Sequence, residues 1–172
     1  MVSRELSDKI REYLEKGLED EQFIMEATES TFGGKCYKAT DKQDMYEHID
    51  FFWETPKGET IGIDAKGIKK NKQKDKKKDD SIHWVEIQNV NGRLGWLYGK
   101  AKYIAFRTFT DIIYVKLSTL QKFVEHKIRG KTLVYQNPSE CYIPYQRFGR
   151  KDMVIKVPTD DLRAIADFSI IL

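Results

Sequence analysis

The sequence predicts a mixed α/β fold, that is α/β or α+β, with a central mixed β-sheet flanked by helices. Residues 44–66, 81–90 and 101–117 are rich in aromatic and β-branched side chains, which favour strands. Residues 4–16 and 118–128 instead carry apolar side chains at helical spacing. Helical and strand segments are interleaved along the chain, and this order favours a sheet with helices packed on it.

The composition is that of one globular domain. The 172 residues are 40% hydrophobic and 33% charged, so residues 1–172 can form a single domain with its own core. No apolar run approaches the roughly 18–20 residues of a membrane span, and the first residues lack the apolar stretch of a secretory signal. Two cysteines, Cys36 and Cys141, are too few for a disulfide scaffold and lack zinc-ligand spacing. We therefore expect a cytoplasmic protein without a membrane partner.

The N-terminal third contains one clear helix and one ambiguous segment. Leu6, Ile10 and Leu14 fall on one face of a helix over residues 4–16. Residues 20–31 can continue as a helix or begin a strand, because their apolar side chains fit either period.

Residues 44–66 predict a β-hairpin. Its first run is aromatic and β-branched, and Pro56 and Gly58 mark the turn. In the second run the isoleucines point to one face, whereas Asp64 and Lys66 point to the other.

Three side chains of this hairpin form a candidate site. Pairing of the two strands brings Asp50 opposite Asp64 and Lys66. Paired carboxylates bind hard divalent cations such as Mg²⁺. A neighbouring lysine can orient or deprotonate a water molecule, or stabilise charge in the transition state. The alternative is a solvated Asp-x-Lys pair on a strand surface without any function.

The next segments predict further strands. Residues 81–90 alternate as a third strand of the same meander, with Glu86 and Gln88 on one face. Asn91-Gly92 indicates a turn, and strands are expected from about residue 101 and over residues 112–117.

The C-terminal third predicts two helices and a strand. A helix over residues 118–128 has Ser118 or Thr119 as its N-cap, and residues 153–157 form a short strand. Thr159 is expected to cap the last helix.

Positive charge is concentrated next to the hairpin. The net charge of the chain is +3, and residues 69–80 hold seven lysines against three aspartates. Residues 68–81 cannot bury an apolar face, so they predict a mobile loop that either is only solvated or neutralises phosphates. The segment 142–151 adds arginines beside aromatic side chains. The candidate nucleic-acid contacts are Lys69, Lys70, Lys72, Lys100, Arg147, Arg150 and Lys151.

The order Asp50, then Asp64-Ala65-Lys66, across a hairpin resembles the PD-(D/E)xK nuclease superfamily. Ile49 stands where that superfamily commonly has proline. Over roughly residues 44–117 the chain is similar to small phage-encoded members, through the strings Trp84-Val-Glu, Asn91-Gly, Gly95-Trp-Leu-Tyr-Gly-Lys and Tyr103-Ile-Ala-Phe. The resemblance implies a restriction-endonuclease-like αβββαβ core.

The resemblance also implies a function. We expect a Mg²⁺-dependent nuclease, with Mn²⁺ able to substitute, that hydrolyses phosphodiester bonds. DNA is favoured over RNA as substrate, and endonuclease over exonuclease action. Asp50 and Asp64 would hold the metal, with Glu86 as a further candidate ligand. Lys66 would position or activate the attacking water, and Gln88 would assist.

Several alternatives stay open at this point. Superfamily members often place another acid on the first helix, for which Glu5, Glu12 and Glu26 are candidates. A nucleic-acid-binding module without turnover and a phage assembly protein would both use the same fold. A junction-cutting enzyme would be a homodimer, because two cuts need two sites, whereas a processive exonuclease would form a ring. If the gene belongs to a phage, the protein would act in the host cytoplasm.

Overall fold

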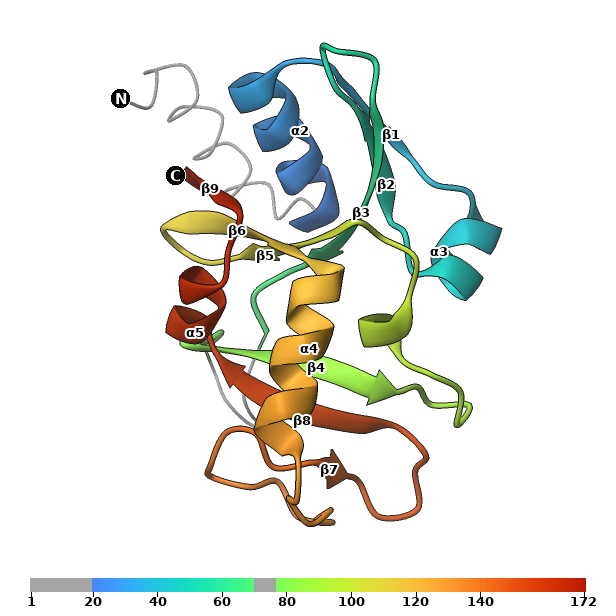
Figure 1. Cartoon of the computed structure of the whole chain (residues 1–172), viewed down its shortest axis with the longest axis vertical. Coiled ribbons are helices and arrows are strands. Elements are labelled where there is room, and N and C mark those ends of the chain that lie inside the picture. The colour runs from blue at the N-terminus through green and yellow to red at the C-terminus, as the bar shows by residue number, and fades with distance from the viewer. Residues whose placement is uncertain (1–19, 70–76) are drawn as a thin grey trace.

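The computed structural model describes residues 20–69 and 77–172, which form four α-helices, nine β-strands and one 3₁₀-helix (Figure 1). In chain order the elements are α2 (Asp20–Phe32), β1 (Lys35–Lys38), α3 (Asp41–Glu47), β2 (Phe51–Glu54), β3 (Thr60–Lys66), β4 (Ile82–Gln88), η1 (Trp96–Tyr98), β5 (Tyr103–Arg107), β6 (Asp111–Lys116), α4 (Leu117–Ile128), β7 (Tyr145–Gln146), β8 (Met153–Pro158), α5 (Thr159–Ala164) and β9 (Phe168–Ile171). The mixed α/β class and the central mixed sheet are confirmed. The helix expected over residues 4–16, with Glu5 and Glu12, lies outside the described residues, as do Lys70 and Lys72. Among the described helices, none is both long and apolar enough to cross a membrane.

The strands form two sheets. Six strands make a mixed sheet in the order β1-β2-β3-β5-β6-β9, in which only β3 and β5 are parallel neighbours. The other three make an antiparallel sheet in the order β4-β8-β7, which lies below the first in Figure 1.

The expectation that residues 81–90 extend the hairpin is wrong. The edge of β3 next to Ile63–Lys66 is occupied by β5, and β4 pairs with β8 in the second sheet. A three-stranded antiparallel meander does exist, but it consists of β1, β2 and β3. Strand β1 was not expected, because its four residues are mostly exposed and show no apolar alternation.

The hairpin is confirmed over β2 and β3, which pair from Phe51 with Ile63 to Glu54 with Thr60. The segment before β2 is a helix, not a strand, because Thr40 and Gln43 form a capping box. The Gln43 N–H donates to the Thr40 hydroxyl at 3.2 Å, and the Thr40 N–H donates to the Gln43 side chain at 3.0 Å. Residues 20–31, which the sequence left open, are helical in α2.

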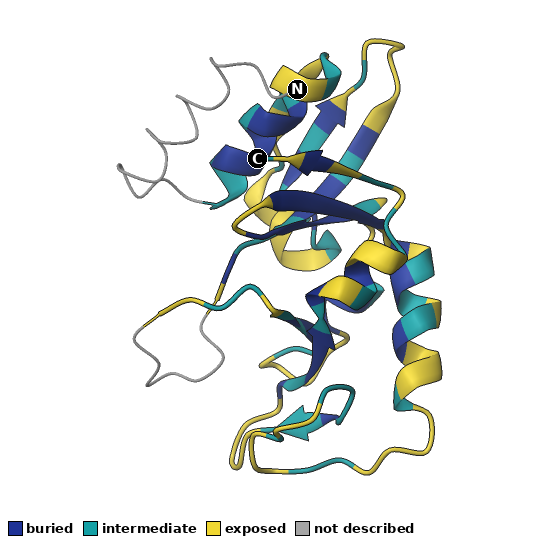
Figure 2. Ribbon diagram, turned by 90° about the vertical axis from the view of Figure 1, so that its left-hand side faces the viewer, coloured by how far each residue is buried: buried dark blue, intermediate teal, exposed yellow. Residues whose placement is uncertain are grey.

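Two apolar clusters lie on opposite faces of the six-stranded sheet. Helix α2 covers one face, where its Phe23 and Ile24 pack with Phe51, Ile63 and Tyr114 of the sheet. The other face packs against α4, η1 and the second sheet, and its cluster includes Ile104, Phe106, Leu120, Val85 and Ile155. Figure 2 shows that buried residues dominate β5 and β6 between these layers.

Two expected helix caps are wrong. Helix α4 begins at Leu117 without a side-chain cap, so neither Ser118 nor Thr119 is its N-cap. Thr159 is the first residue of α5, and its hydroxyl donates to the carbonyl of Asp80. That bond ties α5 to the start of β4.

Candidate metal centre

The hairpin register brings the three predicted site residues together. Asp50 directly precedes β2, and its N–H donates to the carbonyl of Ile63 at 3.0 Å. One oxygen of the Asp50 carboxylate accepts the N–H of Ala65 at 2.7 Å. The Asp50 side chain is therefore held against β3, between the two residues that the Asp-x-Lys pattern singles out.

Asp64 is buried at the centre of this arrangement. It lies beside Ile104 in the parallel β3–β5 pair, on the face that packs toward the second sheet, and is only 1% exposed. The Lys66 ammonium lies 2.5 Å from its Oδ1. Both carboxylate oxygens are buried, and apart from this ion pair and the neighbouring Asp50 carboxyl they have few polar partners among the described residues. A buried carboxylate with so few partners is costly to fold, because its desolvation is not compensated.

The ionisation of Asp64 reflects its surroundings. The pKa of Asp64 is raised from 3.8 to about 8, chiefly by burial; the charge of Lys66 lowers it, and the charge and hydrogen bonding of Asp50 raise it. The effect of burial is larger than that of the lysine. A bound cation would favour the ionised carboxylate. Either a proton or a metal ion would therefore offset the cost of burying its negative charge.

A third carboxylate, Asp44, lies near these residues and was missed by the sequence analysis. It belongs to α3 and is exposed. Partial burial and the charge of Asp50 raise its pKa, whereas the charge of Lys66 lowers it. The capping box at Thr40 was the available signal, because it predicts a helix and therefore turns Asp44 toward Asp50 instead of along a strand.

Glu86 and Gln88, which the sequence placed at the site, lie on the second sheet. Glu86 lines a cavity of about 240 Å³ whose wall also includes Lys66, so it lies close to the lysine. The side-chain amide of Gln88 donates to the carbonyl of Lys151 at 2.6 Å, and the residue is half-buried at the end of the β4–β8 pair. The geometry gives Gln88 a structural contact and no contact with Asp64.

Acids of α2 are engaged elsewhere. Glu26 accepts a hydrogen bond from Gln22 at 2.8 Å. Asp20 reaches the end of β3, where a Cβ at Gly67 would lie 1.7 Å from its carboxylate, but it pairs with Arg107 at 2.5 Å. Within residues 20–69 and 77–172, no three His, Cys, Asp or Glu side chains converge as a metal cluster. A cation held by Asp50 and Asp64 would thus take most of its ligands from water or substrate, as Mg²⁺ does.

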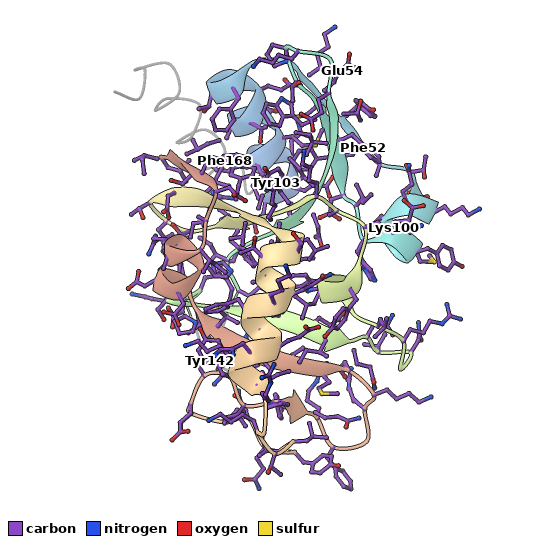
Figure 3. The ribbon with its side chains drawn as sticks, viewed as in Figure 1. Phe52, Glu54, Lys100, Tyr103, Tyr142 and Phe168 are labelled. Carbon is purple, nitrogen blue, oxygen red and sulfur yellow. The ribbon has the colours of Figure 1, made fainter. Side chains whose placement is uncertain are left out.

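The predicted nucleic-acid contacts are spread over both sheets. Lys69 is exposed and its backbone pairs with Asp79. Lys100 lies beside α3 with its ammonium 3.8 Å from Glu47 (Figure 3). Arg147 pairs with Asp152 at 2.7 Å. Arg150 and Lys151 are exposed in the loop between β7 and β8.

A hollow between α3 and the β4–η1 turn lies on the same side as Lys100. Its volume is about 630 Å³, and its lining includes Tyr46, His48, Arg93 and Tyr98. A basic side chain among aromatic ones suits contact with a nucleic-acid strand.

Comparisons of the chain with protein-family models, with curated proteins and with solved structures found no match.

Proposed function

We propose that this chain is a divalent-metal-dependent nuclease that hydrolyses phosphodiester bonds, with DNA as the favoured substrate and internal cleavage as the favoured mode. The observation that carries the proposal is the buried Asp64 carboxylate, which lies beside Asp50 and has the Lys66 ammonium as its one close cationic partner among the described residues. A structural role explains this arrangement poorly, because an apolar residue at the same position would avoid the desolvation cost.

The donor set fits a hard cation. Both aspartates offer carboxylate oxygens, which Mg²⁺ and Mn²⁺ prefer, and Asp64 Oδ2 would be a ligand that the Lys66 contact at Oδ1 does not occupy. Asp44 lies within electrostatic reach of Asp50 and Lys66 but does not converge with Asp50 and Asp64 as a third metal ligand. A bound Mg²⁺ would supply Lewis acidity at a phosphoryl oxygen and balance the negative charge that develops there.

Lys66 is the residue that we assign to the attacking water. Its ammonium lies between the Asp64 carboxylate and the ring of Trp96, whose centroid is 4.7 Å away. If Asp64 held a metal ion, its attraction for Lys66 would weaken, and Lys66 would be free to orient a water molecule or to take its proton. Trp96 restricts the directions that the side chain can then take.

Nucleic acid is the substrate that the surroundings suit. The exposed lysines 69, 77 and 78 flank the segment that follows β3, so they can neutralise phosphates next to Lys66. Lys100 and Arg93 extend the positive charge toward α3. These contacts carry no base information, so they predict affinity and not sequence specificity.

The experiment is a cleavage assay on linear, circular and branched DNA and on RNA, with Mg²⁺, Mn²⁺ or chelator. We expect metal-dependent cutting that Asp64→Asn abolishes and that Asp160→Asn, a change of a 92% exposed acid side chain, leaves intact. If the protein binds nucleic acid but cuts none with any of the metals, it is a binding module of the same fold and not a nuclease. Equal cutting by wild type and Asp64→Asn would exclude the proposed site.

A further inference from the structure

The cavity beside Lys66 is bounded on one side by an unpaired strand edge. Among the described strands, β4 pairs with β8 alone, apart from one bridge between Gln88 at its end and Leu94. The residues of β4 that line the cavity include Trp84 and Glu86. The Tyr142 N–H donates to the carbonyl of Lys156 at 3.0 Å, so the backbone of Lys156 points away from β4. Lys156 is the register partner of Trp84. Trp84 and Lys156 are therefore a non-hydrogen-bonded pair, in which both residues direct their N–H and C=O groups away from the partner strand. The backbone N–H and C=O of Trp84 accordingly face the cavity.

The chain passes close to this edge at Gly95. A Cβ at Gly95 would lie 2.4 Å from the carbonyl oxygen of Glu86, so only glycine permits this approach. The N–H of Gly95 donates to the carbonyl of Ile87 at 2.8 Å and closes one end of the edge. No described strand pairs with the edge at Trp84, which lies beside Lys66 and Lys69 in the cavity lining.

Two buried side chains complete the lining. Trp96 is 7% exposed and lies against Lys66. His83 is 4% exposed, and its Nε2 is buried without a hydrogen-bond partner among the described residues. A native protein rarely leaves such a group unsatisfied, so His83 points to a ligand that supplies the missing partner.

We infer that this cavity takes one unpaired nucleotide of the substrate, next to the phosphate that is cut. The base would bond with the Trp84 backbone, which offers one donor and one acceptor, and with His83, while its face rests on Trp96. Lys69 and Lys66 would contact the phosphate. The volume of about 240 Å³ equals that of about eight water molecules, which admits a single base and excludes a base pair. This inference rests on the proposed nuclease function and adds to it a substrate class, namely single-stranded, flapped or unstacked nucleic acid.

Binding is tested apart from cleavage by titrating 2′-deoxyadenosine 5′-monophosphate in the presence of chelator and following ¹H–¹⁵N NMR signals. We expect the backbone amide of Trp84 and the indole N–H of Trp96 to shift together and to saturate. The indole of Trp53 is the internal control, because it donates to the carbonyl of Gly33 in the other apolar cluster and should not move. Saturating nucleotide without a shift at Trp84 would overturn the inference.

Variants test the individual contacts. His83→Phe keeps the aromatic packing on Phe106, whose ring centroid is 5.0 Å away, and removes the nitrogen. It should weaken nucleotide binding about five- to ten-fold, as expected for one hydrogen bond. Lys69→Ala changes an exposed side chain and should reduce both the affinity and its salt dependence. The control that matches His83→Phe is His126→Phe, at an exposed position of α4, which should change neither. Unchanged affinity in both His83→Phe and Lys69→Ala would overturn the assignment.

A cleavage comparison separates this inference from the function on which it rests. With Mg²⁺, a single-stranded or flapped oligonucleotide should be cut at least ten-fold faster than the same sequence fully paired, because unstacking a paired base costs a few kcal/mol. Equal cutting of both, without an NMR shift, would refute the cavity assignment and leave the nuclease standing. An NMR shift at Trp84 without cutting of any substrate would refute the nuclease and keep the nucleotide site.

Discussion

Replacing Asp64 by asparagine should stabilise the fold at neutral and alkaline pH. The folded-state pKa of Asp64 is raised from 3.8 to about 8, and each pKa unit corresponds to about 1.4 kcal/mol, so at pH 8 the ionised carboxylate costs several kcal/mol of folding free energy. Asparagine avoids this cost, and the lost attraction to Lys66 is already contained in the raised pKa. The gain at pH 8 should therefore be several kcal/mol, with about 2–4 °C in Tm for each kcal/mol.

The pH dependence gives the sign of this effect. A raised pKa means that the folded protein holds the Asp64 proton more tightly than the unfolded chain does. The stability that this proton contributes is therefore fully present below about pH 4 and is lost as pH rises toward 8. Thermal unfolding followed by circular dichroism in chelator should therefore show equal Tm values at pH 4 and a growing advantage of Asp64→Asn up to pH 8.

The control is Asp111→Asn. Arg163 holds the Asp111 carboxylate at 2.9 Å and, together with the Thr108 hydroxyl, keeps its pKa below the ordinary value. Asp111→Asn should accordingly destabilise the fold at neutral pH, with the loss shrinking in acid. If Asp64→Asn instead lowers Tm at pH 8 as Asp111→Asn does, Asp64 is a structural ion-pair partner, and the reasoning for a metal site fails.

Three further predictions follow from the same geometry. Lys66→Ala should lower the cleavage rate about 10²- to 10⁴-fold in single-turnover assays while substrate affinity changes only a few-fold; a comparable loss of both would make Lys66 a binding residue. Burial lowers the pKa of His83 from 6.5 to about 4, so the free energy of unfolding of the wild type should fall by up to about 3 kcal/mol between pH 6.5 and pH 4. Urea unfolding measures this loss, and the same pH dependence in His83→Phe would contradict it. Changing both Lys77 and Lys78 to alanine should reduce the slope of log K against log salt by about 1.4–1.8 in DNA-binding titrations. The control Lys122→Ala on α4 should leave the slope unchanged. An unaltered slope in the double variant would show that these lysines only face solvent.

The hairpin and its three site residues could be predicted from sequence because their signals are local. Pro56 and Gly58 mark the turn, and the period of two along β3 places Asp64 and Lys66 on one face. The burial of Asp64 could not be predicted, since it depends on β5 and on the second sheet, which lie far along the chain.

Strand β4 shows where pattern alone is insufficient. Its alternation is the same whether it pairs with β3 or with β8, and only the long-range pairing from Ile82 with Pro158 to Gln88 with Met153 decides. The unpaired edge of β4 follows from that choice, so the cavity beside Lys66 had no signal in the sequence. By contrast, α3 was predictable from Thr40 and Gln43, and the aromatic run that follows obscured it.

The most direct measurement is an anomalous difference map from a crystal soaked in Mn²⁺. We predict one peak within coordination distance of both Asp50 and Asp64, with the Lys66 ammonium moved away from Asp64 Oδ1. A map without a peak between the two aspartates at saturating Mn²⁺, with Lys66 still paired to Asp64, would contradict the metal centre and the nuclease proposal that depends on it.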